Sequence, residues 1–251
     1  MEDFNAGSTV SVSHWLRLRA SAVHLYTASG AVLTLLILIA AYNGNAVLAL
    51  WLMLATLIVD STDGLLARRF RVKEFLPFFD GSLLDNIVDY MTYVLAPILL
   101  LWTTGYLPSG TFGVVLATLP ILASSYQFCR VDAKTGDDSE TDHFFLGFPS
   151  YWNVVAFYAI VFDLGAWVVG TILLICSLLV FVPIRYAYPS RTITFHKLTL
   201  TLTTLWLLAY VIILVQMPNP TPLLLVFSLF YLVYYFGLSL YITRKTLKPA
   251  A

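Results

Sequence analysis

The chain has 251 residues, of which 59% are hydrophobic and only 11% are charged, and its formal net charge is zero. So few charges exclude an ordinary water-soluble globular protein, and we expect no nucleic-acid partner. The composition instead indicates an all-α, polytopic membrane protein.

Eight apolar segments are predicted to cross the membrane as helices. A spanning helix needs about 20 mostly apolar residues, because backbone polar groups in hydrocarbon must pair within the segment itself. The segments lie at residues 21–41, 45–67, 81–103, 111–128, 150–164, 166–184, 198–216 and 221–242. The fifth is the weakest, since residues 150–184 as one helix would be about 50 Å long and must fold back near residues 163–166.

Basic residues predict the orientation of these segments. All 14 Lys and Arg residues precede the first segment or follow the second, fourth, sixth and eighth. Because Lys and Arg collect in cytoplasmic loops, we expect both termini in the cytoplasm. The basic face would also attract anionic lipid head groups and phosphorylated substrates, although topology control alone explains it equally well.

Two of the cytoplasmic connections have distinctive sequences. Residues 69–79 alternate bulky apolar and charged side chains, which is typical of a segment that lies along the membrane surface. Residues 130–148 form a polar loop rich in acidic residues. We interpret this loop as a solvated linker rather than a metal site, although its length leaves room for a lid over an active site.

Four aspartates in the second and third segments carry the strongest functional signal. They belong to two helix faces, an i, i+3, i+4, i+7 stripe of Asp60, Asp63, Gly64 and Ala67, and an i, i+4, i+8 stripe of Gly81, Asp85 and Asp89. A carboxylate near the bilayer centre costs about 2.5–3.5 kcal/mol, so such residues are functional candidates. The four would repel one another without a counter-ion. A hard divalent cation, which prefers oxygen ligands, resolves this conflict.

Small residues accompany the aspartates on the same faces. Gly64, Ala67 and Gly81 remove side-chain bulk and leave a slot. A slot rimmed by Arg68 would suit a diphosphate, because a guanidinium supplies a directed fork of donors. Close helix packing explains any single glycine equally well. The complete set in register favours a site for a metal and a nucleotide.

At these residues the sequence resembles the CDP-alcohol phosphotransferase family, whose signature is D-x2-D-G-x2-A-R, a spacer, and G-x3-D-x3-D. Every fixed position is matched, by Asp60, Asp63, Gly64, Ala67, Arg68, Gly81, Asp85 and Asp89. The 12 residues between Arg68 and Gly81 make a longer spacer than most members have. This spacer, the eight helices and the phrases at residues 24–32 and 147–153 resemble the bacterial phosphatidylcholine synthases, which condense CDP-diacylglycerol with choline.

The resemblance implies a division of the chain and a place in the cell. Residues 1–251 would form a single membrane domain, with a cytoplasmic segment at 1–20, a six-helix catalytic core at 21–184 and two additional C-terminal helices within 185–251. The enzyme would lie in the bacterial inner membrane with its active site facing the cytoplasm, and it would form a homodimer.

The resemblance also implies roles for the signature residues. Asp60, Asp63 and Asp85 would be the principal ligands of two Mn²⁺ or Mg²⁺ ions. Asp89 would lie near the metals and act as the general base for the choline hydroxyl. The nucleotide and diphosphate of CDP-diacylglycerol would contact Asp60, Gly64, Ala67, Arg68 and Gly81.

Choline binding is expected to involve aromatic residues, because a quaternary ammonium has no N–H group to donate and is usually held by ring faces. The candidates lie near predicted cytoplasmic helix ends: Tyr26, Tyr151, Trp152, Asn153, Tyr186 and Tyr188. Asn153 is the expected partner of the hydroxyl. Trp152 is the favoured aromatic contact, since an indole gives the strongest cation–π face.

Two other functions remain open from the sequence. Within the family, the acceptor could instead be serine, inositol or glycerol phosphate, and Arg130, Arg185 and Arg191 are available to bind a phosphorylated acceptor. A transporter could also use intramembrane aspartates that face a polar cavity. The adjoining spacing of glycine and alanine argues against the transporter.

Overall fold

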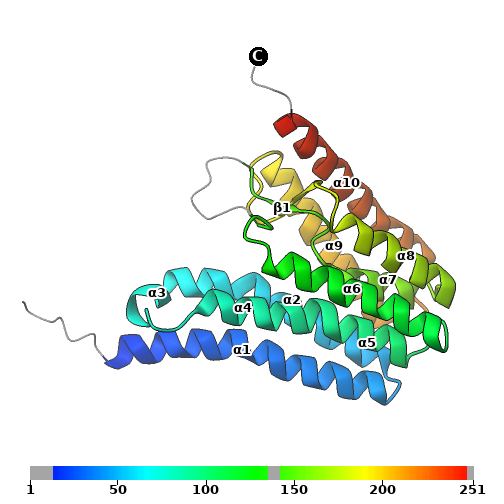
Figure 1. Cartoon of the computed structure of the whole chain (residues 1–251), viewed down its shortest axis with the longest axis horizontal. Helices are drawn as coiled ribbons and strands as arrows, with labels where there is room; N and C mark the ends of the chain where they lie inside the picture. Colours follow the sequence, from blue (N-terminus) through cyan, green and yellow to red (C-terminus); the bar gives the residue numbers. More distant parts are fainter. Residues whose placement is uncertain (1–13, 135–141, 248–251) are drawn as a thin grey trace, which may run out of the picture.

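The computed structural model describes residues 14–134 and 142–247, and helices dominate this part of the chain (Figure 1). The helices are α1 (His14–Tyr42), α2 (Ala46–Arg69), α3 (Val72–Phe75), α4 (Gly81–Asp89), the π-helix η1 (Tyr90–Leu95), α5 (Ala96–Thr103), α6 (Thr111–Cys129), α7 (Trp152–Val161), α8 (Ala166–Leu179), α9 (His196–Gln216) and α10 (Pro222–Leu247). Two short strands, β1 (Phe144–Leu146) and β2 (Arg185–Ala187), complete the fold. The prediction of a helical polytopic membrane protein is confirmed.

Six helical runs in the described residues are long and apolar enough to cross a membrane. They are α1, α2, the continuous Gly81–Thr103 run of α4, η1 and α5, and then α6, α9 and α10. The expected fifth and sixth spans are α7 and α8, which have only 10 and 14 residues. The chain folds back between them at Asp163, whose φ of 47° is left-handed, so the predicted turn is confirmed. The number of crossings and the side of the termini stay predictions.

The first helix begins earlier than the sequence predicted. α1 starts at His14, so Arg17 and Arg19 lie on its first turns. The expectation that these two residues precede the helix is therefore wrong. A membrane helix can extend past the hydrocarbon into the interface, where basic side chains are tolerated, so hydropathy does not mark its end.

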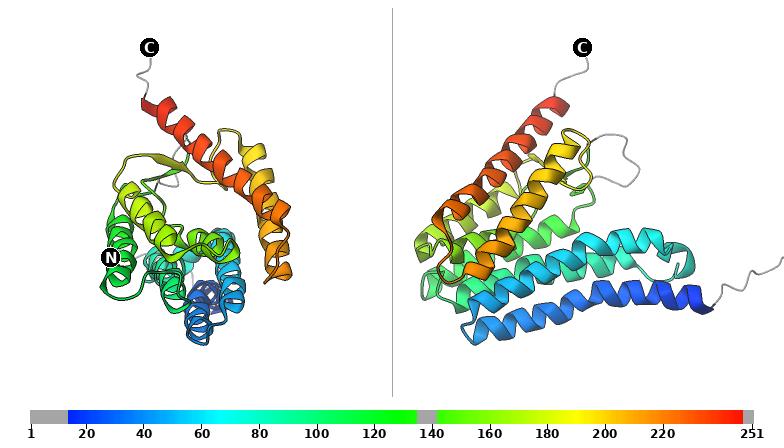
Figure 2. Two further views of the ribbon diagram at one scale, coloured as in Figure 1. Left: turned by 90° about the vertical axis from the view of Figure 1, so that its right-hand side faces the viewer. Right: turned by 180° about the vertical axis from the view of Figure 1, so that it is seen from behind.

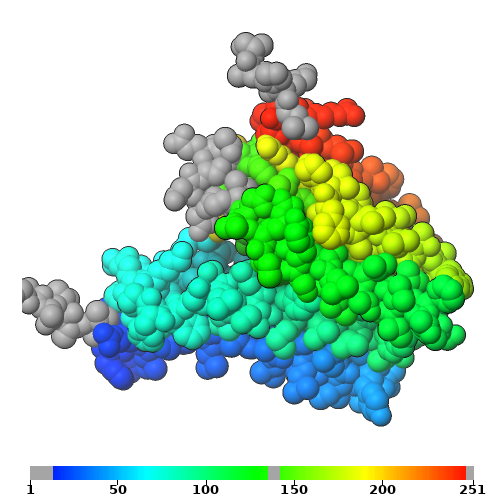
Figure 3. All heavy atoms as spheres, in the orientation of Figure 1, coloured from blue at the N-terminus to red at the C-terminus, as the bar shows by residue number. Residues whose placement is uncertain are grey.

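The helices form two groups that converge at one end and splay apart at the other. α1, α2 and the α4–α5 run lie side by side, and α3 connects α2 to α4 (Figure 1). α9 and α10 pack as a slanting pair, with α6, α7 and α8 between the two groups (Figure 2). The splayed outline persists when side chains are drawn (Figure 3). The splay opens toward the end at which α2 finishes and α4 begins.

α7 is enclosed by the other helices. Eight of its 10 residues are buried, and Trp152 is fully buried. Nε1 of Trp152 donates a hydrogen bond to Oγ of Ser124 at 2.8 Å, and its ring packs on Phe148 with 5.1 Å between the centroids. α7 therefore fills the centre of the protein, which explains why so short a helix is so apolar.

A two-stranded antiparallel ribbon, which the sequence did not predict, joins the acidic loop to the segment before α9. β1 and β2 pair with Phe145 opposite Tyr186. Backbone N–H groups of β2 donate to Oγ1 of Thr243 and Oγ of Ser239 on α10, at 2.8 and 3.1 Å. The end of the expected solvated loop is therefore structured, while residues 135–141 lie outside the described residues.

α1 and α4 approach each other closely at Gly30. A Cβ atom at this position would lie only 2.5 Å from Cγ1 of Val88, so a larger residue forces the Val88 side chain or its helix to shift. Small residues allow membrane helices to pack closely in this way. The contact holds α4 against α1, and α1 also packs along α2.

We predict that Gly30→Ala destabilises the protein, because overpacking a tight contact costs about 1–3 kcal/mol. The midpoint of thermal unfolding of the purified protein in detergent should fall. Adding Val88→Ala removes the methyl group that the new Cβ would meet, so the double variant should recover most of the loss. A Gly30→Ala variant that unfolds at the parent's temperature would contradict this packing.

Candidate metal and nucleotide site

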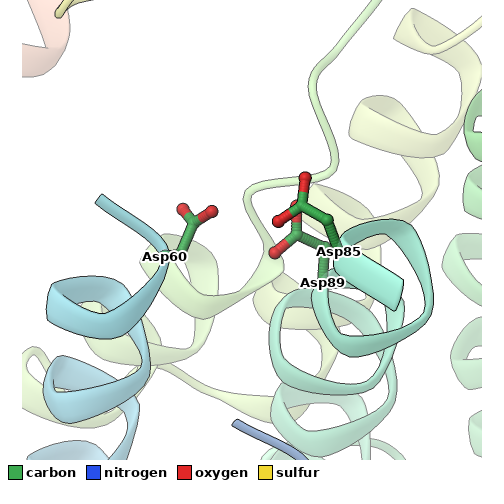
Figure 4. Close-up of side chains that lie close together, drawn as sticks. All are labelled: Asp60, Asp85 and Asp89. Carbon is green, nitrogen blue, oxygen red and sulfur yellow. The ribbon is translucent and has the colours of Figure 1, made fainter. Parts of the chain in front are cut away.

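Three carboxylates from two helices meet at the splayed end of the protein. Asp60, Asp85 and Asp89 each offer an oxygen atom, and these oxygens all lie within 4.8 Å of one another. Asp60 projects from α2 toward Asp85 and Asp89, which lie one turn apart on α4 (Figure 4). All three residues are half-buried. Asp60 of α2 therefore lies opposite Asp85 and Asp89 of α4.

This group of oxygens fits a divalent cation. Three carboxylates so close together repel one another, and partial burial reduces the screening that water and salt would provide. Carboxylate oxygens are the ligands that Mg²⁺ and Mn²⁺ prefer, and such ions commonly keep open positions for substrate phosphates. The donor set supports a metal site, while the identity and number of the ions stay predictions.

Tyr93 orients one of the carboxylates. Its hydroxyl donates a hydrogen bond to Oδ2 of Asp60 at 2.6 Å, which leaves Oδ1 for coordination. Tyr93 was not among the predicted site residues. It continues the i+4 series of Gly81, Asp85 and Asp89, so the spacing in the sequence contained a signal for it. It lies in η1, and π-helical turns of this kind frequently occur at functional sites.

Asp63 occupies a different environment. It is buried, and its Oδ2 accepts a hydrogen bond from Oγ1 of Thr27 on α1 at 2.9 Å. Among the carboxylates of the described residues, Asp63 does not belong to the close group around Asp60. Its part as a further metal ligand therefore stays a prediction, and Thr27 joins the site as a residue that the sequence did not single out.

The three small residues of the signature have different surroundings. A Cβ atom on Gly64 would meet only Nη1 of the exposed Arg68, at 3.6 Å, so Gly64 faces open space. A Cβ atom on Gly81 would lie 2.7 Å from Cε1 of His24, so this glycine permits helix packing. Ala67 packs against the apolar cluster of Ala20, Val23, Val72 and Leu76. Of the three positions, Gly64 is the one that keeps a slot open beside Arg68.

Lys134 brings a positive charge toward the carboxylates. The sequence suggested no role for Lys134 in the site, only a contribution to the orientation of the helices in the membrane. Burial works to lower the pKa of Lys134, but Tyr188 and the three clustered carboxylates outweigh that effect and raise the pKa above its usual value. The segment that follows α6 therefore places a cation within Coulombic range of the candidate metal site.

Three of the expected choline contacts are enclosed. Trp152 and Tyr186 are fully buried. Asn153 is also buried, and its Oδ1 accepts a hydrogen bond from the N–H of Val154 at 2.9 Å. Trp152, the favoured aromatic contact, has its ring packed in the core, so it offers no open face to a cation.

The other candidates retain access to solvent. Tyr26 is half-buried on α1 and its hydroxyl shares a hydrogen bond with Oγ1 of Thr62 at 2.8 Å. Tyr151 and Tyr188 are half-buried, and both rings contact Phe145, with centroid distances of 6.3 and 4.8 Å. Phe145 was missed by the sequence because its position depends on the unpredicted ribbon.

Comparison with known proteins agrees with the signature. The sequence model of the CDP-alcohol phosphatidyltransferase family matches residues 22–182. A phosphatidylcholine synthase of Legionella bozemanae is 41% identical, over 82% of this chain and 95% of that protein. Proteins of the same name from Legionella pneumophila and Pseudomonas aeruginosa are 46% and 41% identical, over 67% and 83% of this chain and 64% and 85% of their own lengths. With this match spanning the helices that carry all four aspartates, the chain belongs to the CDP-alcohol phosphatidyltransferase family.

Proposed function

We propose that this protein transfers the phosphatidyl group of CDP-diacylglycerol to choline and releases CMP. The observation that carries the proposal is the group of three carboxylates from α2 and α4, which is suited to a metal-bound diphosphate. Choline is supported by the relatives named phosphatidylcholine synthase, one of which is matched over 95% of its length. The membrane helices suit a substrate whose acyl chains lie in the bilayer.

Different signature residues bind the metal, the diphosphate and the nucleotide. Asp60 and Asp85 would hold the metal, with Asp63 as the expected further ligand and Asp89 close to the ion. A bound Mg²⁺ or Mn²⁺ ion would offset the charge of the diphosphate and polarise the phosphoryl oxygens. Arg68 donates hydrogen bonds to the diphosphate, and the open space at Gly64 admits the nucleotide.

Asp89 is the proposed general base. It accepts the hydroxyl proton of choline as that oxygen attacks the phosphorus that carries diacylglycerol. A new bond forms between the choline oxygen and phosphorus, and the bond from that phosphorus to the bridging oxygen breaks, so CMP leaves. A carboxylate is a weak base toward an alcohol, so the alignment of the reactants must supply much of the acceleration.

The proposed location is the bacterial inner membrane, with the site facing the cytoplasm. The basic residues at the end of α2 and the end of α10 support this orientation, because such residues collect on the cytoplasmic side. The homodimer expected from the family resemblance belongs to the same proposal.

The reaction can be tested with purified protein, CDP-diacylglycerol and separate acceptors, namely choline, ethanolamine, serine, inositol and glycerol phosphate. We expect CMP and phosphatidylcholine to form with choline, and chelation of divalent ions to stop the reaction. Asp85→Asn should lower kcat about 100-fold or more, because it removes an anionic ligand.

A matched control lies nearby. Asp80 is exposed and caps α4 by accepting hydrogen bonds from the N–H groups of Ser82 and Leu83. Asparagine caps helices about as well as aspartate, so Asp80→Asn should keep kcat within about twofold of the parent. Transfer to serine, inositol or glycerol phosphate in place of choline would overturn the proposed acceptor and leave the metal site standing.

The Asp89→Asn variant tests whether Asp89 acts as a general base or as a metal ligand. If Asp89 acts mainly as the base, the variant should lose about 100-fold in kcat while its dissociation constant for CDP-diacylglycerol changes by less than about threefold. Binding can be followed by equilibrium titration of the lipid nucleotide in detergent with divalent metal present. A loss of affinity as large as the loss of rate would show that Asp89 serves chiefly as a ligand.

Gly64→Ala tests the nucleotide slot. The new methyl group meets only the flexible end of Arg68, so the fold should be unchanged. The KM for CDP-diacylglycerol should nevertheless rise about 10-fold, because the methyl group fills space that the ligand needs. In Gly81→Ala the new methyl group should instead clash with His24. Adding His24→Ala should therefore restore the activity of Gly81→Ala, and it should not restore the activity of Gly64→Ala. An unchanged KM in Gly64→Ala would contradict the slot.

A further inference from the structure

The ammonium group of Lys134 lies over two aromatic rings. Nζ of Lys134 lies 5.4 Å from the ring centroid of Tyr188 and 5.9 Å from that of Phe145. A cation is attracted to the face of an aromatic ring within about 6 Å of its centroid. The two rings therefore form a cation-binding site, and the side chain of Lys134 occupies it.

The ribbon brings these rings together. Phe145 is the middle residue of β1, and the N–H of Tyr188 donates to the carbonyl oxygen of His143 at 3.3 Å, just beyond β2. The rings of Phe145 and Tyr188 are 4.8 Å apart at 35°. Tyr151 adds a third ring, which meets Phe145 edge-on at 77°. All three are half-buried and keep some exposed surface, in contrast to the fully buried Trp152.

Lys134 links this aromatic group to the candidate metal site. Lys134 is within Coulombic range of Asp60, Asp85 and Asp89, and Tyr151 is within Coulombic range of Asp60. Choline carries its hydroxyl two carbons away from its quaternary ammonium. An acceptor site must therefore place the cation near the atoms that react. Lys134 connects the rings to those carboxylates, because its ammonium lies over two of the rings and its charge acts on Asp60, Asp85 and Asp89.

We infer that Phe145 and Tyr188, flanked by Tyr151, bind the quaternary ammonium of the acceptor, and that Lys134 occupies this place in the unliganded protein. The inference rests on the proposed function, because it takes choline as the acceptor. Lys134 and choline then compete for the same rings. The lysine keeps a positive charge near the clustered carboxylates until the acceptor cation replaces it.

The competition predicts opposite effects at neighbouring positions. Lys134→Met keeps a side chain of similar length without its charge, so the KM for choline should fall about 3- to 10-fold. Phe145→Leu and Tyr188→Leu each remove a ring face, and each should raise the KM for choline about 3- to 30-fold. The KM for CDP-diacylglycerol should stay within about twofold of the parent in all three variants, which also reports intact folding.

Phe144→Leu is the matched control. Phe144 lies in the same strand and also has a cation near its ring, with Cζ of Arg185 at 4.6 Å. Successive residues of a strand point to opposite faces, so this ring lies on the other face from Phe145. Its removal should leave the KM for choline within about twofold of the parent.

Tetramethylammonium isolates cation binding from the reaction, because it has no hydroxyl group. It should inhibit competitively against choline, and its inhibition constant should fall in Lys134→Met and rise in Phe145→Leu and Tyr188→Leu. Inhibition that is noncompetitive with choline, or equal in all variants, would overturn the inference.

The remaining outcomes separate this inference from the proposed function. Choline-dependent release of CMP with a choline KM indifferent to Phe145 and Tyr188 would overturn the acceptor site alone. A raised KM for CDP-diacylglycerol in Lys134→Met, with the choline KM unchanged, would show that Lys134 binds the diphosphate and would also overturn it. No release of CMP with choline in the parent protein would overturn the proposed function together with this site.

Discussion

The arrangement of the protein depends on holding three carboxylates together in a chain that is otherwise apolar. Such charges are costly in a membrane and repel one another, so they persist only where a cation and fixed hydrogen bonds offset that cost. Oxygen atoms of Asp60, Asp85 and Asp89 lie within 4.8 Å of one another. Tyr93 of η1 bonds to Asp60 from the same continuous helical run that carries the other two aspartates. The surrounding helices set this spacing.

α1 provides most of that support although it contributes none of the clustered carboxylates. Along α1, Thr27 donates to Asp63 on α2, while His24 fills the space beside Gly81 on α4. Gly30 leaves room for the side chain of Val88, so α4 can pack closely on α1. The distance between the two aspartate-bearing helices is therefore set by a third helix that packs on both. This explains why residues outside the signature matter for the geometry of the site.

The C-terminal helices support the side of the site where we place the acceptor. α10 receives hydrogen bonds from β2, and Asp142, just before β1, accepts hydrogen bonds from the N–H and the hydroxyl of Thr194 at 2.6 and 2.5 Å. Lys245 of α10 lies 3.3 Å from the same carboxylate. These bonds hold the ribbon that positions Phe145 and Tyr188. The helices that carry the aspartates and the ribbon that carries Phe145 thus belong to separate structural groups.

The sequence by itself determined the apolar helices, the turn at Asp163 and the faces that carry the aspartates, because helical periodicity and the length of an apolar segment are local properties. Tertiary structure alone decided which carboxylates converge, that Asp63 bonds to Thr27, and that Gly81 makes room for His24. It also placed Trp152 in the core and brought Lys134 to Phe145. Each of these outcomes depends on contacts between segments far apart in the chain, and neither periodicity nor residue type specifies which distant segments will meet.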